Sequence, residues 1–116
     1  MTMPDLTVSW IKCTNDVWCS FAGVNLDNDH FNNLRGVYII WNSDTVVRVG
    51  SGIIKDRIAA HREDDEISDY DNLKVTWAKV NATQMEGVEK YLADELDPAV
   101  GERFPDRTAI SVNFPW

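Results

Sequence analysis

The feature that most constrains the fold is a short apolar run in the first half of the chain, residues 36–41. Gly36 is followed by Val, Tyr, Ile, Ile and Trp, and the turn-forming sequence Asn42-Ser43-Asp44 comes directly afterwards. A run of this kind between a glycine and turn residues predicts a buried β-strand. Residues 45–49 resume the β-branched pattern after the turn, so we expect them to pair with it as a hairpin.

Further β segments are expected on both sides of this hairpin. Residues 6–13 and 17–24 are predicted to form an N-terminal hairpin around Asn15-Asp16, and residues 27–34 a helical turn. Residues 73–80 alternate apolar and polar side chains, which predicts a half-buried strand.

Two helices complete the expected fold. The first runs from Ser51 or Gly52 to about Arg62, a region rich in good helix formers. The second opens at residues 83–86, which fit a capping box, and ends at about Leu96, before Pro98. Residues 98–116 are expected to be ordered coil, with 110–112 extended.

The chain of 116 residues is expected to form one domain. The order of elements predicts an α+β fold, a small central antiparallel or mixed β-sheet flanked by helices. Within it, residues 1–35 are an N-terminal β extension, 36–101 the core and 102–116 an ordered tail.

The net charge of −8 is unusual for a protein that binds nucleic acid, because such surfaces are normally basic. Six of the acids lie in residues 63–71, a segment with no Lys or Arg, and removing them leaves −8 + 6 = −2. We interpret this segment as a solvated connector. A protein-binding patch and a rim that attracts metal ions are the alternatives.

Compartment and redox state follow from simpler features. No apolar run reaches the roughly 18 residues that cross a membrane, and residues 1–5 lack the pattern of a signal peptide. We therefore expect a cytoplasmic protein, in which Cys13 and Cys19 are most simply free thiols and a disulfide is the less favoured alternative.

Glu89 is the first candidate for chemistry. In the expected second helix, Met85, Val88, Leu92 and Leu96 form an apolar stripe, and Glu89 projects into it. A carboxylate aimed at a core is costly unless it is paired or binds a metal. An ion pair with an arginine is one explanation, and an Mg²⁺ ligand whose shell is completed by water and phosphate is the other.

Three further side chains suit phosphate chemistry. Arg57 and His61 lie four residues apart and so share a helix face, where an arginine can bind phosphate and a histidine can transfer a proton. The alternative is an arginine that extends to the surface and a histidine of the core. Tyr38 lies inside the buried strand, either as a core residue or as the group that receives a proton from attacking water.

Together these residues resemble the GIY-YIG nuclease family. Gly36-Val37-Tyr38 matches the first element of its signature, and Arg48-Val49-Gly50 stands at the second, with Arg48 in place of a tyrosine. Arg57, His61 and Glu89 follow in the family's order, and the resemblance covers about residues 36–101. The family's asparagine is expected near Gly101, and Asn113 is the amide that can replace it.

The resemblance implies an endonuclease that hydrolyses DNA with Mg²⁺ or Mn²⁺. Tyr38 would be the general base or the group that orients water, and Glu89 the metal ligand. Arg57 and Arg48 would bind phosphate with Asn113, and His61 would position the nucleophile or Tyr38. These roles combine a positioned water, an electrophilic metal and cations on the transition-state oxygens.

Two other interpretations remain open. One is a binding module that keeps this scaffold without catalysis and binds a basic protein partner through acidic residues 63–71. The other is a structural domain whose polar core residues, Glu89 with Arg57, only pair with each other.

Overall fold

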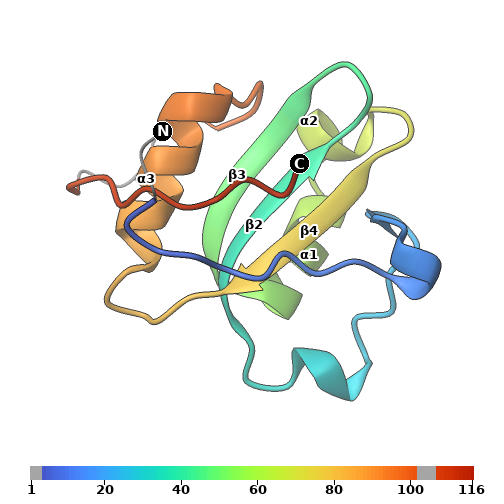
Figure 1. Cartoon of the computed structure of the whole chain (residues 1–116). Helices are drawn as coiled ribbons and strands as arrows, with labels where there is room; N and C mark the ends of the chain where they lie inside the picture. The colour runs from blue at the N-terminus through green and yellow to red at the C-terminus, as the bar shows by residue number, and fades with distance from the viewer. Residues whose placement is uncertain (1–3, 102–106) are drawn as a thin grey trace.

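The structure of the chain is a computed structural model that describes residues 4–101 and 107–116. It contains a four-stranded antiparallel sheet in the order β1-β4-β2-β3 (Figure 1). The strands are β1 (Cys19–Ser20), β2 (Arg35–Trp41), β3 (Val46–Ile53) and β4 (Lys74–Lys79). The predicted α+β class and the β2–β3 hairpin are therefore confirmed.

Helices cover both faces of the sheet. Behind it in Figure 1 lie α1 (Ile54–Arg62) and α2 (Asp65–Ser68), and in front lies α3 (Met85–Leu96). The two terminal segments cross the same front face as α3. Among the described residues, no helix is long and apolar enough to span a bilayer.

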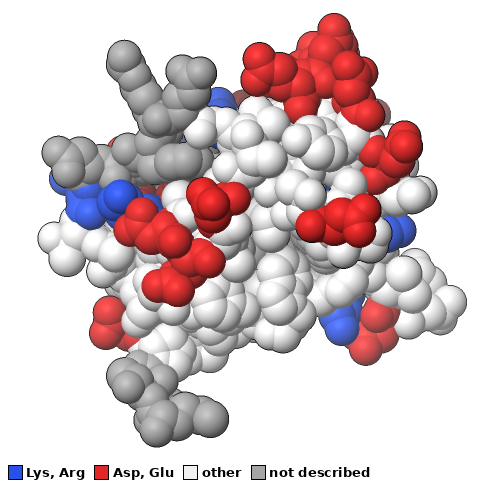
Figure 2. Space-filling model, turned by 90° about the horizontal axis from the view of Figure 1, so that it is seen from above, with Lys and Arg blue, Asp and Glu red and all other residues white. Residues whose placement is uncertain are grey.

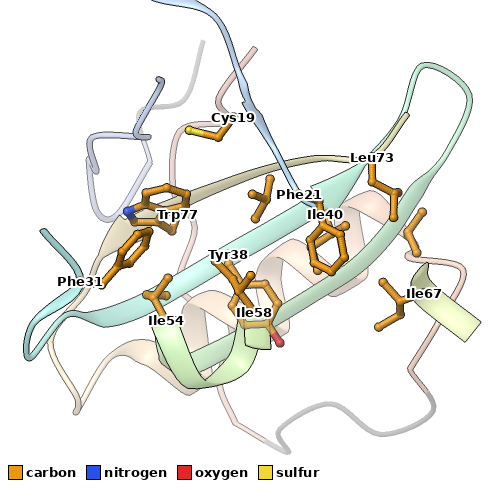
Figure 3. Close-up of a cluster of buried hydrophobic side chains, with 12 residues drawn as sticks. Cys19, Phe21, Phe31, Tyr38, Ile40, Ile54, Ile58, Ile67, Leu73 and Trp77 are labelled. Atoms are coloured by element: carbon orange, nitrogen blue, oxygen red, sulfur yellow. The ribbon is translucent and has the colours of Figure 1, made fainter. Parts of the chain in front are cut away.

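The sheet separates two apolar clusters. Tyr38 and Ile40 face the α1 side, where Figure 3 shows them among aromatic and aliphatic side chains. Val37 and Ile39 face α3. All four are fully buried, which explains why β2 is continuously apolar rather than alternating.

β4 was expected to be half-buried, and this was wrong. Its residues Val75, Thr76, Trp77 and Ala78 are all buried because segments cover both of its faces. The hydroxyl of Thr76 is satisfied by donating to the carbonyl of Ile11 at 2.8 Å. A polar residue in an alternating pattern therefore did not mark a solvent-facing side.

Both main helices begin differently from the expectation. α1 starts at Ile54 because β3 continues through Ser51 and Gly52, with Gly52 at φ +131°. α3 begins at Met85 without the predicted capping box, since Gln84 is its N-cap and makes no side-chain capping bond. Its end at Leu96, before Pro98, agrees with the prediction.

The expected N-terminal hairpin does not form. Residues 6–13 contain no extended ladder, and β1 pairs with β4 instead. The chain reverses through a 3₁₀ turn, η1 (Thr14–Asp16), where Asn15 and Asp16 adopt positive φ. The predicted helical turn in residues 27–34 is confirmed as η2 (Asp29–Phe31).

The prediction of free thiols is also wrong, because Cys13 and Cys19 form a disulfide. The η1 reversal brings their Cα atoms to 5.1 Å, within the range that a disulfide requires. The free thiols were expected from a reducing compartment, whereas the proximity of the two cysteines depends on the positive-φ turn between them.

The terminal segments are joined to each other. Leu6 bridges to Val112 in parallel, so the extended conformation expected at 110–112 reduces to a single bridge. Part of the predicted tail, residues 102–106, lies outside the described residues. The acidic connector of residues 63–71 contains α2, which its buried Ile67 holds against the core.

Candidate functional site

Tyr38 projects from β2 toward α1, and its ring crosses the neighbouring strand at Gly50. The two residues are paired across the ladder, so they share a face of the sheet. A Cβ atom at position 50 would lie 2.1 Å from the Tyr38 hydroxyl. Gly50 therefore leaves the space through which this hydroxyl reaches the edge strand β3.

His61, in the last turn of α1, is the hydrogen-bond partner of the Tyr38 hydroxyl. The Tyr38 oxygen lies 2.5 Å from Nε2 of His61. Burial and, to a smaller extent, the positive charges of Arg48 and Arg57 together lower the pKa of His61 to about 4, against the opposing negative charge of Asp64. His61 is thus neutral at neutral pH, and we assign Nε2 as the atom that accepts the hydrogen bond from the Tyr38 hydroxyl.

Two half-buried arginines flank this pair. Arg48 lies opposite Ile40 in the ladder and therefore on the α1 side of the sheet. Arg57, from α1, runs beside Gly52, where a Cβ atom would be 3.5 Å from its Cγ and Cδ. Within the described ranges, Nε of Arg57 is buried without a hydrogen-bond partner.

Glu89 reaches β3 from the opposite face. It is 8% exposed, and its Oε1 accepts a hydrogen bond of 2.6 Å from the Ser51 hydroxyl. Ser51 pairs with Val37, so both face α3. Burial raises the pKa of Glu89; the Ser51 bond and the charges of Arg48 and Arg57 act against this rise.

The two halves of the site meet around the edge of the sheet. β3 is an edge strand, and its start is covered by backbone bonds from Ala99 and Val100 to Val46 and Val47. The electrostatic effect of the two arginines reaches both His61 and Glu89. The structure therefore brings together five residues that the sequence singled out: Tyr38, Arg48, Arg57, His61 and Glu89.

Asn113 is used elsewhere. Its Oδ1 accepts from the Val8 amide at 2.7 Å, and its Nδ2 donates to the Val8 carbonyl at 3.0 Å. Its own carbonyl accepts from the indole of Trp10 at 2.8 Å. Because both amide atoms already join the N-terminal segment to the C-terminal one, these contacts do not support the predicted substrate role of Asn113.

Sequence reasoning missed two residues of the site. Ser51 was assigned to the start of a helix, which concealed that it faces Glu89 as part of a strand. Gly50 was noted as part of a motif, but its role as space for the Tyr38 ring depends on the ladder register. A longer β3 in the prediction would have revealed both.

Glu89 is the candidate metal ligand of this cluster. Among the described residues, no group of three or more His, Cys, Asp or Glu side chains is placed to hold a metal. Glu89 offers its Oε2, since the Ser51 bond uses Oε1. Mg²⁺ is often bound by one or two carboxylates with waters and phosphate oxygens, so a single carboxylate beside two arginines is compatible with it.

Solvent reaches this cluster unevenly. Tyr38 is fully buried and His61 is 7% exposed, whereas the two arginines are half-buried. Any ligand from solvent would therefore meet the guanidinium groups first.

Comparison of the chain with protein-family models, with curated proteins and with solved structures gives no match.

Proposed function

We propose that this protein is a metal-dependent DNA endonuclease of the GIY-YIG type, with its site around the edge of β3. The observation that carries the proposal is the buried Nε of Arg57, which has no acceptor among the described residues. In a purely structural network, buried donors are normally satisfied. A guanidinium whose Nε has no acceptor, and whose charge acts on the Glu89 carboxylate, is instead suited to an anion that arrives with the substrate.

The Tyr38–His61 pair suits a role in orienting the attacking water. Because neutral His61 accepts a hydrogen bond from the Tyr38 hydroxyl, the hydroxyl is fixed and its oxygen keeps lone pairs for a second hydrogen bond. With a pKa of about 4, His61 is a poor final acceptor for a proton. We therefore assign His61 as a positioning residue and Tyr38 as the group that contacts the water.

The arginines would hold the scissile phosphate. A guanidinium binds two phosphate oxygens in one plane and keeps its charge throughout the reaction. Arg57 is the stronger candidate because its Nε is available, and Arg48 adds positive charge on the same side of the sheet. Both would stabilise the additional negative charge of the transition state.

Glu89 is the proposed ligand for Mg²⁺ or Mn²⁺. When bound, the ion would stabilise charge on phosphate oxygens as a Lewis acid. The Ser51 hydroxyl fixes Oε1 and favours the ionised carboxylate, so Oε2 is left for the ion. Ser51 is accordingly a positioning residue for Glu89.

A nicking assay on supercoiled plasmid tests the proposal. We expect cleavage that requires Mg²⁺ or Mn²⁺ and falls at least about 100-fold in Glu89→Ala and in Arg57→Ala. Glu95→Ala on the exposed side of α3 and Arg35→Ala at the exposed start of β2 are matched controls that should retain activity. Absence of metal-dependent cleavage on single-stranded, double-stranded and branched DNA would refute the proposal.

The second candidate is a non-catalytic module that binds a basic protein. It is favoured by the position of the acids of residues 63–71, most of which are exposed around α2. Viewed from above, the molecule shows more acidic than basic side chains (Figure 2). Reversing the charge of this segment should abolish capture of a basic partner while Glu89→Ala leaves it intact; the opposite pattern would exclude the module.

The cytoplasmic location belongs to the same proposal, since the substrate would be cellular DNA. The Cys13–Cys19 disulfide is more typical of oxidising compartments. Alkylation of thiols during rapid acid lysis measures its state in cells. A reduced pair would agree with the cytoplasmic proposal, and a fully oxidised pair would contradict it.

A further inference from the structure

A concave region lies at the edge of the sheet opposite β3, where β1 pairs with β4. A cavity of about 420 Å³ opens between β1, the start of β4 and the ends of α1 and α2. This volume is within the range of small-molecule sites. It shares none of its lining residues with the Tyr38, Arg57 and Glu89 cluster.

The charge of the cavity contrasts with that of the chain. Its two charged lining residues are Arg62 and Lys74, and none of the described residues that line it is acidic. The chain as a whole has 19 acids and 11 bases. Arg62 reaches the cavity from α1, whereas Lys74 pairs with Trp41 and so borders it from the α3 side of the sheet. A cavity bordered by cations from both sides and by no described carboxylate favours an anion.

Arg62 is held in place by the backbone. Its Nε and Nη2 donate to the carbonyl of Phe21 at 3.0 and 2.8 Å, and Nη2 also donates to the carbonyl of Val24 at 2.7 Å. These bonds do not use Nη1. Neutral carbonyls orient the guanidinium without neutralising it, and burial lowers its pKa, which shows the cost of keeping this charge there. A bound anion would offset that cost.

The remaining lining residues define the rest of the ligand. Ser20 and Ser68 provide hydroxyl donors, and the partly exposed Tyr70 provides aromatic surface next to the buried Phe21. A phosphate monoester carries about two negative charges at neutral pH, which matches two cations better than a carboxylate does. A ring on the ester could pack against the aromatic surface.

The surroundings limit the size of the ligand. Exposed acids at Asp69 and Asp71 lie next to the lining residues in the sequence and would repel a long polyanion. A small ligand that places one phosphate inside the cavity avoids most of this repulsion. We propose that this cavity binds a small phosphate monoester that carries a planar ring, such as a nucleoside monophosphate, independently of the β3 site.

Titration of the ¹⁵N-labelled full chain tests this. The probes are adenosine 5′-monophosphate, adenosine, inorganic phosphate and a 5′-phosphorylated single-stranded oligonucleotide. We expect the monophosphate to shift the amide signals of residues 20–22 and 68–74, and to bind more tightly than adenosine or phosphate. Equal binding of adenosine, or shifts confined to other residues, would overturn the proposal.

Two lysines on β4 provide a matched pair of variants. Lys74→Gln removes a cation from the cavity, whereas Lys79→Gln removes one from the exposed opposite end of the same strand. The affinity for the monophosphate should fall about tenfold in the first and remain unchanged in the second. Equal loss in both variants would reveal non-specific attraction and contradict the site.

The oligonucleotide distinguishes the source of the phosphate. If it does not bind while the monophosphate does, the ligand is a free nucleotide. If both shift the same amides, the cavity also accepts the phosphorylated end of a strand. Failure of both at millimolar concentration would exclude the site. None of these results depends on whether the chain cleaves DNA.

Discussion

Each face of the sheet buries a titratable side chain beside β3 whose pKa is shifted, and the two shifts have opposite directions. His61 lies on the α1 side and Glu89 on the α3 side. Burial disfavours the charged form of both, lowering the pKa of His61 and raising that of Glu89. The positive charges of Arg48 and Arg57 add to this effect at His61 and oppose it at Glu89.

The difference shows how one pair of cations can serve two purposes. On the α1 side it helps keep the imidazole neutral, which preserves an acceptor for the Tyr38 proton. On the α3 side it stabilises the carboxylate, which is the form that can bind a cation. Variants that affect one face alone can therefore separate the two roles.

The largest effect is expected from Gly50→Ala, which affects the α1 side. The added Cβ would lie 2.1 Å from the Tyr38 hydroxyl and must displace the ring from His61. We expect a loss of about 1–3 kcal/mol in the free energy of unfolding, measured with urea. Gly23→Ala is the control, because its Cβ would meet only Ser20 at 3.4 Å. Equal stability of the two variants would contradict the packing described for Tyr38.

Tyr38→Phe should have the next largest effect. It removes the hydroxyl and leaves Nε2 of His61 buried without this partner. The expected loss is about 1–2 kcal/mol in unfolding free energy, and Glu89 should be unaffected because it lies on the other face. Carbon-13 NMR of the Glu89 carboxyl measures its pKa in the variant and in the wild-type chain. A change of this pKa in Tyr38→Phe would contradict the independence of the two faces.

Ser51→Ala is the corresponding change on the α3 side. It removes the donor to Glu89 and should cost about 1 kcal/mol in unfolding free energy. It should also weaken Mn²⁺ binding measured by water proton relaxation, whereas Ser51→Thr, which keeps a hydroxyl, should retain most of it. If alanine and threonine bind Mn²⁺ equally, Ser51 does not position Glu89.

The two faces should also differ in the pH dependence of stability, with changes of opposite sign. In the folded chain His61 has a pKa of about 4, below its ordinary 6.5, so protons favour the unfolded state and stability falls with decreasing pH through this window. The pKa of Glu89 is raised above its ordinary 4.5, so in the window above that value stability falls with increasing pH.

Removing each group should therefore change, in opposite directions, how steeply the free energy of unfolding falls as the pH is lowered. His61→Gln should lessen the loss of stability on acidification, and Glu89→Gln should increase it. Urea unfolding between about pH 7 and pH 5 measures both slopes against the wild-type chain. If the two variants change this pH dependence in the same direction, the opposite pKa shifts of His61 and Glu89 are contradicted.

Particular residues show where prediction from the sequence succeeded. The apolar run of β2 and the turn after it predicted the central hairpin, because a strand buried on both faces needs apolar side chains at every position. Glu89 was identified because a charged residue in an apolar helical stripe needs an explanation in any fold. The Cys13–Cys19 disulfide was not predicted, because the proximity of the two residues depends on a positive-φ turn.

By itself the sequence determined the order of the main elements and the burial of Tyr38 and Glu89, since both follow from local patterns of polarity. Only the tertiary structure decided that Ser51 lies against Glu89, that Gly50 makes room for Tyr38, and that two arginines act on both faces. The physical reason is register. The Tyr38–Gly50 and Ser51–Glu89 contacts join residues 12 and 38 positions apart, and their geometry exists only once β2 and β3 are aligned and the helices have packed on either side.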